Sequence, residues 1–149
     1  MTAIHDGTRR HVAAQATLDR FGAKPFNWTG ATCIHLARFH AQNMGWSVPD
    51  MPRIRSPRSA VTALSGLGFA DVTELLDSLF VRITPAAMLL GDLATLPGSA
   101  EQGSDAEKLS AVVIADGVGG LIGWHAQTDF DRLRPIKLDL SLVTGAWRL

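Results

Sequence analysis

The residue with the clearest chemical potential is Cys33, the only cysteine in the chain. Thr32 before it is a typical helix N-cap, and apolar residues at helical spacing follow, so Cys33 is expected in the first turn of a helix. The positive end of a helix dipole stabilises a thiolate, which is the nucleophilic form of cysteine. The same position also suits an inert thiol, because free cysteine is commonly a small core residue.

A nucleophilic cysteine needs a general base within hydrogen-bonding reach. His40 lies seven residues after Cys33, which is about 10 Å along a helix axis, and His35 points to a different side of the helix. His125, at the end of a predicted strand, is therefore the remaining histidine that could act as the base. The alternative for His125 is a half-buried strand residue that makes only local hydrogen bonds.

The elements that must position these groups change in type along the chain. Hydrophobic spacing, N-caps and glycine stops predict helices over residues 10–21, 33–44, 59–67 and 71–80, with an extended, proline-containing connection over 48–57. Short apolar segments follow at 88–96, 109–115, 121–126, 133–138 and 145–149, with turn residues at 116–120. Helices followed by meandering strands predict an α+β fold in which the helices pack on an antiparallel sheet.

Composition limits the possible classes of protein. The 149 residues, 46% hydrophobic and with a net charge of zero, predict one domain over 1–149, with a flexible N-terminus at 1–9 and a mobile loop at 99–108 that orders in an assembly. No apolar stretch is long enough for a membrane span. One cysteine and scattered histidines predict neither a metal site nor a cofactor.

The charges are divided unequally along the chain. Residues 1–60 contain eight Lys and Arg against three Asp and Glu, whereas residues 61–149 contain six against eleven. The cations of the first part are spread out and match no nucleic-acid-binding motif, so no nucleic-acid partner is expected. The glycine-rich turn at 116–120 lacks the strand-to-helix setting of a phosphate-binding loop.

Two motifs suggest a family. The segment Phe26-Asn27-Trp28-Thr29-Gly30-Ala31-Thr32-Cys33, followed by a helix and later by Gly91-Asp92 at a strand, resembles the NlpC-like cell-wall cysteine peptidases. The resemblance implies a papain-like fold with Cys33 at the position of the nucleophile. It also places Ser110 or Leu109 where the catalytic histidine of these peptidases begins a strand, and uncharged Thr32 where an acidic residue usually precedes the cysteine.

The whole chain from about residue 10 resembles a group of short phage and prophage proteins of this fold, encoded among tail-tip genes of siphophages and gene transfer agents. This resemblance implies a virion structural or adaptor component of a phage-like tail tip, made in the bacterial cytoplasm, with a degenerate active site. Other tail proteins are its expected partners, and peptidoglycan is a further candidate. Two alternatives stay open: an active cell-wall cysteine endopeptidase using Cys33 and His125, and an interaction domain unrelated to peptidases.

Other side chains have two interpretations each. Asp92 is expected to accept hydrogen bonds in a turn or cap rather than to act as a catalytic acid. The four tryptophans could form a surface that stacks on sugars or binds a partner, since large aromatic residues dominate many interfaces. Their spread through the sequence favours ordinary packing instead. These are Trp28, Trp46, Trp124 and Trp147.

Overall fold

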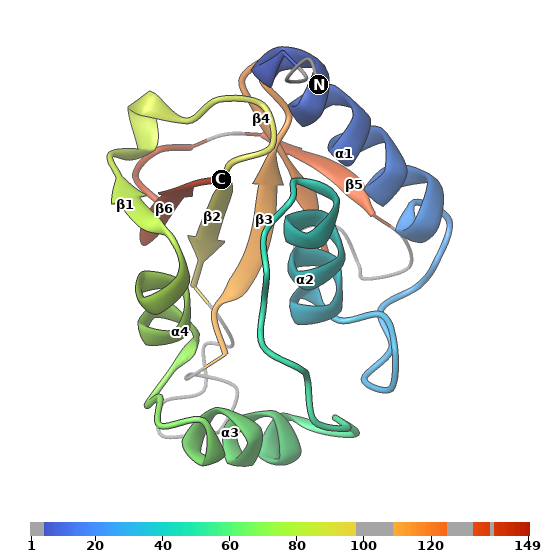
Figure 1. The fold of residues 1–149 in the computed structure, drawn as a ribbon, viewed down its shortest axis with the longest axis vertical. Helices are drawn as coiled ribbons and strands as arrows, with labels where there is room; N and C mark the ends of the chain where they lie inside the picture. Colours follow the sequence, from blue (N-terminus) through green and yellow to red (C-terminus); the bar gives the residue numbers. More distant parts are fainter. Residues whose placement is uncertain (1–4, 98–108, 125–132, 138) are drawn as a thin grey trace.

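The computed structural model describes residues 5–97, 109–124, 133–137 and 139–149. Four α-helices and one antiparallel sheet form most of this part of the chain, with the second and fourth helices in front of the sheet and the third at the lower end of the molecule (Figure 1). The predicted α+β arrangement is therefore confirmed. The predicted mobile loop at 99–108 and the candidate base His125 lie outside the described residues.

The helices follow the prediction with shifted ends. They are α1 (Asp6–Phe21), α2 (Cys33–Asn43), α3 (Pro57–Gly66) and α4 (Val72–Leu79). The first begins four residues earlier than predicted and includes part of the segment expected to be flexible. The Asp6 carboxylate holds this first turn by pairing with Arg9 at 2.6 Å and Arg10 at 2.8 Å. Hydrogen bonds from these two guanidinium groups, Arg9 first, lower the pKa of Asp6 from 3.8 to about 2.

Six strands form the sheet in the order β1-β6-β2-β3-β4-β5, and every neighbouring pair is antiparallel. The strands are β1 (Val81–Ile83), β2 (Leu93–Leu96), β3 (Ala111–Ala115), β4 (Gly120–Gly123), β5 (Arg134–Lys137) and β6 (Gly145–Arg148). The sequence did not predict β1, which pairs with the distant β6. The predicted strand at 88–96 forms only over its second half, because a short helical turn, η1 (Pro85–Ala87), and Gly91 with φ of 87° bend the chain before it.

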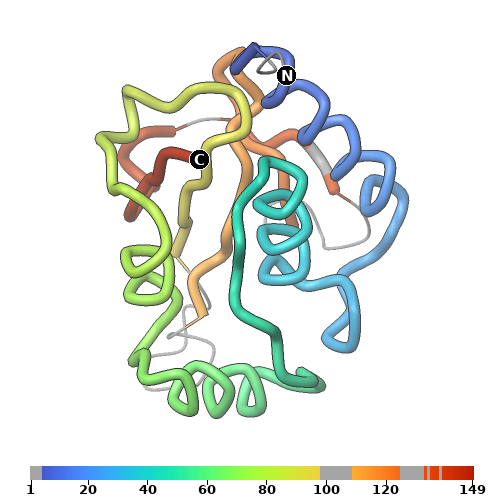
Figure 2. The backbone as a smooth tube through the Cα atoms, in the orientation of Figure 1, coloured from blue at the N-terminus to red at the C-terminus, as the bar shows by residue number. Residues whose placement is uncertain are grey.

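Strand alternation divides the apolar residues between the two sheet faces. Leu93, Val112 and Ile114 face the helices and join their side chains in the larger core, whereas Val113 and Ala115 belong to a smaller cluster on the other face. The chain between α2 and α3 runs extended alongside β3, as Figure 2 shows. This path brings the predicted proline-rich connection over the helix-covered face of the sheet. Within the described residues, no helix is both long and apolar enough to cross a bilayer.

Candidate functional site

The N-terminus of α2 places Cys33 against the beginning of β3. Its thiol donates a long hydrogen bond to the main-chain oxygen of Ser110, with Sγ and O 3.9 Å apart. Ser110 directly precedes β3, and Leu109 before it packs against the larger core between the helices and the sheet. The structure thus brings together the residue at the nucleophile position and the residue at the expected histidine position.

The environment of Cys33 favours a neutral thiol. Burial is the largest influence and raises the pKa of Cys33 above its ordinary 9.0, although main-chain groups of Val112, Cys33 itself and Ile34 act in the opposite direction. This direction is opposite to the one that a helix N-terminus alone favours, and it suits the inert thiol of the second interpretation. Removing the thiolate from water disfavours it by more than the nearby N–H groups stabilise it.

We expect Cys33 to react slowly with electrophiles at neutral pH. Its alkylation by iodoacetamide at pH 7 should be at least about tenfold slower than that of an unstructured cysteine peptide, because thiolate is the reacting form. The rate should still be rising with pH at 9, the ordinary pKa of the group, instead of levelling off there. Mass spectrometry of alkylated protein over time measures this, and a rate above that of the free peptide at pH 7 would show that Cys33 is activated.

His35 caps the helix that carries Cys33. Its Nδ1 accepts a hydrogen bond from the main-chain N–H of Thr32 at 3.2 Å and lies 2.7 Å from the Thr32 hydroxyl, which in turn accepts from the N–H of His35. This is a capping box in which histidine replaces the usual Glu or Gln. Burial, and secondly the charge of Arg38, lower the pKa of His35. The sequence analysis identified Thr32 as the cap but missed the return bond of His35, for which the three-residue spacing from Thr32 was the signal.

His40 is fully buried on α2 and bonded on both ring nitrogens. Nε2 lies 2.8 Å from the main-chain oxygen of Gly91, and Nδ1 lies 3.3 Å from the hydroxyl of Thr17. Since a carbonyl only accepts, Nε2 carries a proton. This histidine ties α1 and α2 to the turn before β2, and neither it nor His35 is hydrogen-bonded to Cys33. The predicted pairing of Cys33 with His125 stays a prediction, because His125 lies outside the described residues.

We expect His40 to make stability depend on pH. Burial is the main cause that lowers its pKa below the ordinary 6.5. The unfolded chain therefore binds a proton near pH 6.5 that the folded chain does not yet bind, and stability falls as the pH drops below that value. Urea unfolding at pH 7 and pH 5 should show a larger loss for the wild type than for His40→Gln, which keeps an N–H donor. Equal losses in the two proteins would contradict this role.

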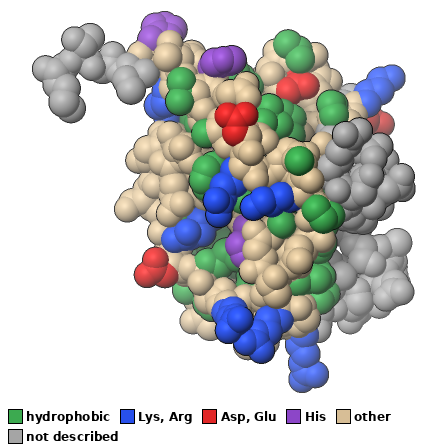
Figure 3. All heavy atoms as spheres, turned by 90° about the vertical axis from the view of Figure 1, so that its right-hand side faces the viewer, with side chains coloured by type: hydrophobic (Ala, Val, Ile, Leu, Met, Phe, Trp, Pro, Cys, Tyr) green, Lys and Arg blue, Asp and Glu red, His purple; other side chains and the backbone are tan. Residues whose placement is uncertain are grey.

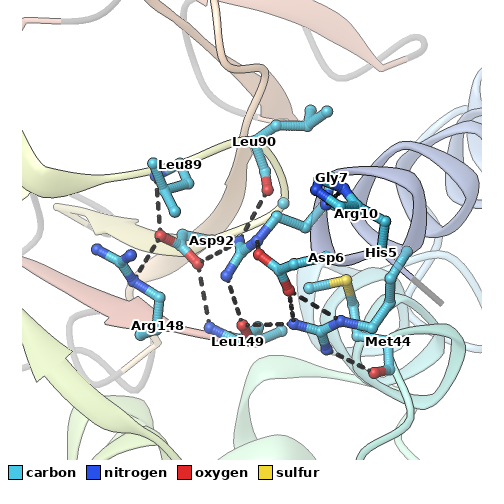
Figure 4. Close-up of polar contacts among 12 residues, drawn as sticks. His5, Asp6, Gly7, Arg10, Met44, Leu89, Leu90, Asp92, Arg148 and Leu149 are labelled. Carbon is cyan, nitrogen blue, oxygen red and sulfur yellow. Dashed lines mark hydrogen bonds and ion pairs between the residues drawn. The ribbon is translucent and has the colours of Figure 1, made fainter. Parts of the chain in front are cut away.

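The Gly91-Asp92 pair forms a structural junction rather than a catalytic group. One oxygen of Asp92 accepts from Arg10 Nη1 at 2.7 Å and from the N–H of Leu149 at 3.1 Å, and the other accepts from the N–H of Leu89 at 2.9 Å (Figure 4). Arg148 Nε adds an ion-pair contact at 3.2 Å without hydrogen-bond geometry. Both oxygens of the fully buried carboxylate therefore accept hydrogen bonds from neighbouring protein groups, in agreement with the expected acceptor role.

Arg10 completes this junction, and the sequence alone did not reveal it as a partner of Asp92. Its guanidinium group also bonds to the main-chain oxygens of Leu90 and Leu149 and to the carboxylate of Asp6 (Figure 4). The side chain is only 5% exposed. One arginine thus joins α1, the turn before β2 and the end of β6.

The tryptophans pack within the core or against other aromatic rings rather than together on one exposed surface. Trp124 and Trp147 are buried in the core. Phe26 contacts both Trp28 and Trp124 edge to face, at ring distances of 5.1 and 6.0 Å, whereas Trp46 is 37% exposed and packs on another phenylalanine. These placements support the packing interpretation. Among the residues that the structure describes, no three His, Cys, Asp or Glu side chains come together as metal ligands.

Comparisons with known proteins agree with this geometry. The crystal structure of the P60 domain from an antigen of M. avium paratuberculosis superposes with a TM-score of 0.59, covering 97% of this chain and 95% of that one at 12% identity. This likeness shows a shared fold, so the predicted papain-like, NlpC-type arrangement is confirmed. No curated protein matches the sequence. A family model described as "Domain of unknown function (DUF6950)" matches residues 8–148, and the chain belongs to that family.

Proposed function

We propose that this protein is a virion component, a structural or adaptor protein of a phage-like tail tip, and that its cysteine-peptidase scaffold is not used for catalysis. The contact of Cys33 with Ser110 carries the second part of the proposal. A serine at the histidine position supplies no general base at neutral pH. Without a base, a thiol is far less effective in acyl transfer.

Two further observations support an inactive scaffold. The pKa of Cys33 is raised by burial, which is opposite to the shift that a nucleophile requires. The two histidines on the same helix are engaged elsewhere, His35 in the cap of α2 and His40 with Gly91. These bonds give His35 and His40 structural roles within the fold.

The tail-tip location rests on the resemblance of the whole chain to phage and gene-transfer-agent proteins. In this proposal the protein is made in the bacterial cytoplasm and incorporated into the virion. Other tail or tail-tip proteins are its partners, and peptidoglycan is a further candidate. The P60-like fold spans nearly the whole chain, which supports the part of that resemblance that concerns the scaffold.

One observation favours the alternative of an active cell-wall endopeptidase. Cys33 occupies the first turn of a helix that packs on the sheet of a P60-like fold. In that alternative His125 takes the thiol proton as Sγ attacks a peptide carbonyl. It then gives the proton to the leaving amine, and water hydrolyses the thioester to release the acid and restore the thiol.

Genetics of a phage or prophage that encodes this chain would test both functions. We expect the protein in purified particles by mass spectrometry, defective tails after deletion of its gene, and normal infectivity for Cys33→Ala. Purified wild-type protein should leave peptidoglycan stem peptides uncut. Absence from particles would refute the structural role, and stem-peptide cleavage that Cys33→Ala abolishes would establish the peptidase.

A further inference from the structure

An apolar hollow lies between the helices and the sheet. It has a volume of about 90 Å³ and is bounded by α2, the extended residues 48–54, α3, α4 and the two central strands. Leu64, Leu76 and Val112 are among the core side chains in its wall. Water needs two to four polar partners to be held in such a space. The walls offer almost none, so the hollow favours an apolar group.

A second, open hollow of about 670 Å³ adjoins the first on the outer side of α3. The two share Pro52, Ala63 and Leu67, and Leu67 is 43% exposed at their common border. Arg53 and Arg58 line the open hollow. The apolar hollow is therefore continuous with a basic surface that contains Arg53 and Arg58.

The arginines of this basic surface have no acidic partners of their own. Arg53, Arg55 and Arg58 are exposed, and within the described residues their side chains form no ion pair or hydrogen bond. No acidic residue stands in the first turn of α3. In Figure 3, Lys and Arg side chains gather at the lower end of the molecule, the end that α3 occupies in Figure 1. Clustered like charges repel one another, so an anion bound among them is favoured.

We infer that this surface binds an acidic peptide segment of a partner protein, with one aliphatic side chain in the apolar hollow and carboxylates on the arginines. The inference deepens the adaptor proposal, because it names the chemistry of the partner. It rests on residues other than Cys33 and Ser110. Pockets that hold one buried anchor beside complementary charges are the usual centres of protein interfaces.

The size of the hollow favours a side chain over other anionic ligands. An apolar cavity of roughly 150 Å³ holds a benzene molecule, so about 90 Å³ suits an aliphatic side chain. The alkyl chain of a lipid is too long for it. A nucleic acid would leave the apolar hollow unused, because its contacts are mostly with phosphate groups.

The test uses the full chain and a synthetic peptide, acetyl-Asp-Glu-Asp-Leu-Asp-Glu-Asp-amide, titrated by NMR. We expect shifts at residues around both hollows, and binding that weakens when salt is raised from about 0.05 M to about 0.5 M. Replacing the central leucine by alanine should weaken binding about tenfold. Ala63→Phe, which fills the shared border, and Arg58→Glu should each weaken binding at least as much, whereas Lys137→Glu on β5 should match the wild type apart from a small net-charge effect.

Several results would overturn the inference. Equal affinity for the leucine and alanine peptides would show that the apolar hollow is unused. Binding to vesicles containing phosphatidylglycerol, or to single-stranded DNA, without binding to the peptide would assign the arginines to another ligand. Peptide binding that appears only when Glu101, Asp105 and Glu107 are changed to glutamine would show that the chain's own acidic residues fill the surface. Cys33→Ala should bind as the wild type does, so peptidase activity would refute the adaptor function without affecting this result.

Discussion

Asp92→Ala is expected to lower the free energy of unfolding by about 3–5 kcal/mol, because the buried guanidinium group of Arg10 loses its buried partner and keeps only the exposed carboxylate of Asp6. Arg10 is 5% exposed and Asp92 is fully buried, with 2.7 Å between Nη1 and Oδ1. The substitution also removes the acceptor for the N–H groups of Leu89 and Leu149. Urea unfolding with linear extrapolation measures the change.

Asp50→Ala is the matched control for this prediction. Asp50 pairs with Arg38 at 3.6 Å, but its side chain is fully exposed, so water and salt screen the pair. Its urea midpoint should stay close to that of the wild type. If Asp92→Ala is no more destabilising than Asp50→Ala, the junction at Asp92 does not hold α1 to the sheet.

The helices were largely predictable because their signals are local. Thr32 and Asp71 cap α2 and α4 as the sequence indicated, each accepting from the N–H three residues later. Ser56 caps α3 in the same way and moves its start before the predicted residue. A cap and its acceptor lie within one turn of each other, so the sequence alone contains the information.

The parts that the sequence did not reveal depend on distant residues. Strand β1 is three residues long and exists through its pairing with β6, where Val81 lies opposite Arg148. Arg10 and Asp92 are 82 positions apart, and no local pattern connects them. Gly91 turns the chain with positive φ where the apolar composition alone suggested a continuous strand.

For the candidate site, the family resemblance and the structure contributed different facts. The resemblance implied position 110 as the place of the catalytic histidine, and in the structure the main-chain oxygen of Ser110 accepts from Cys33. It could not give the direction of the shift in the Cys33 pKa, because burial under the sheet is a property of the folded chain. The uneven division of charge has a structural counterpart. Arg10 is buried with an aspartate of the acidic part, whereas Arg53 and Arg58 are exposed and form no ion pair within the described residues.

Ser110→His is expected to speed the alkylation of Cys33 at pH 7 at least about tenfold. The Cys33 thiol contacts the main-chain oxygen of residue 110, so an imidazole introduced at this position can reach the thiol proton. Pairing with histidine lowers a thiol pKa by several units, and the lower intrinsic reactivity of such a thiolate offsets only part of the gain. Ser110→Ala should leave the rate unchanged, and Ser141→His in an exposed turn controls for an added imidazole. If Ser110→His reacts no faster than Ser110→Ala, position 110 is not the vacant site of a base, and the proposed loss of catalysis needs another cause.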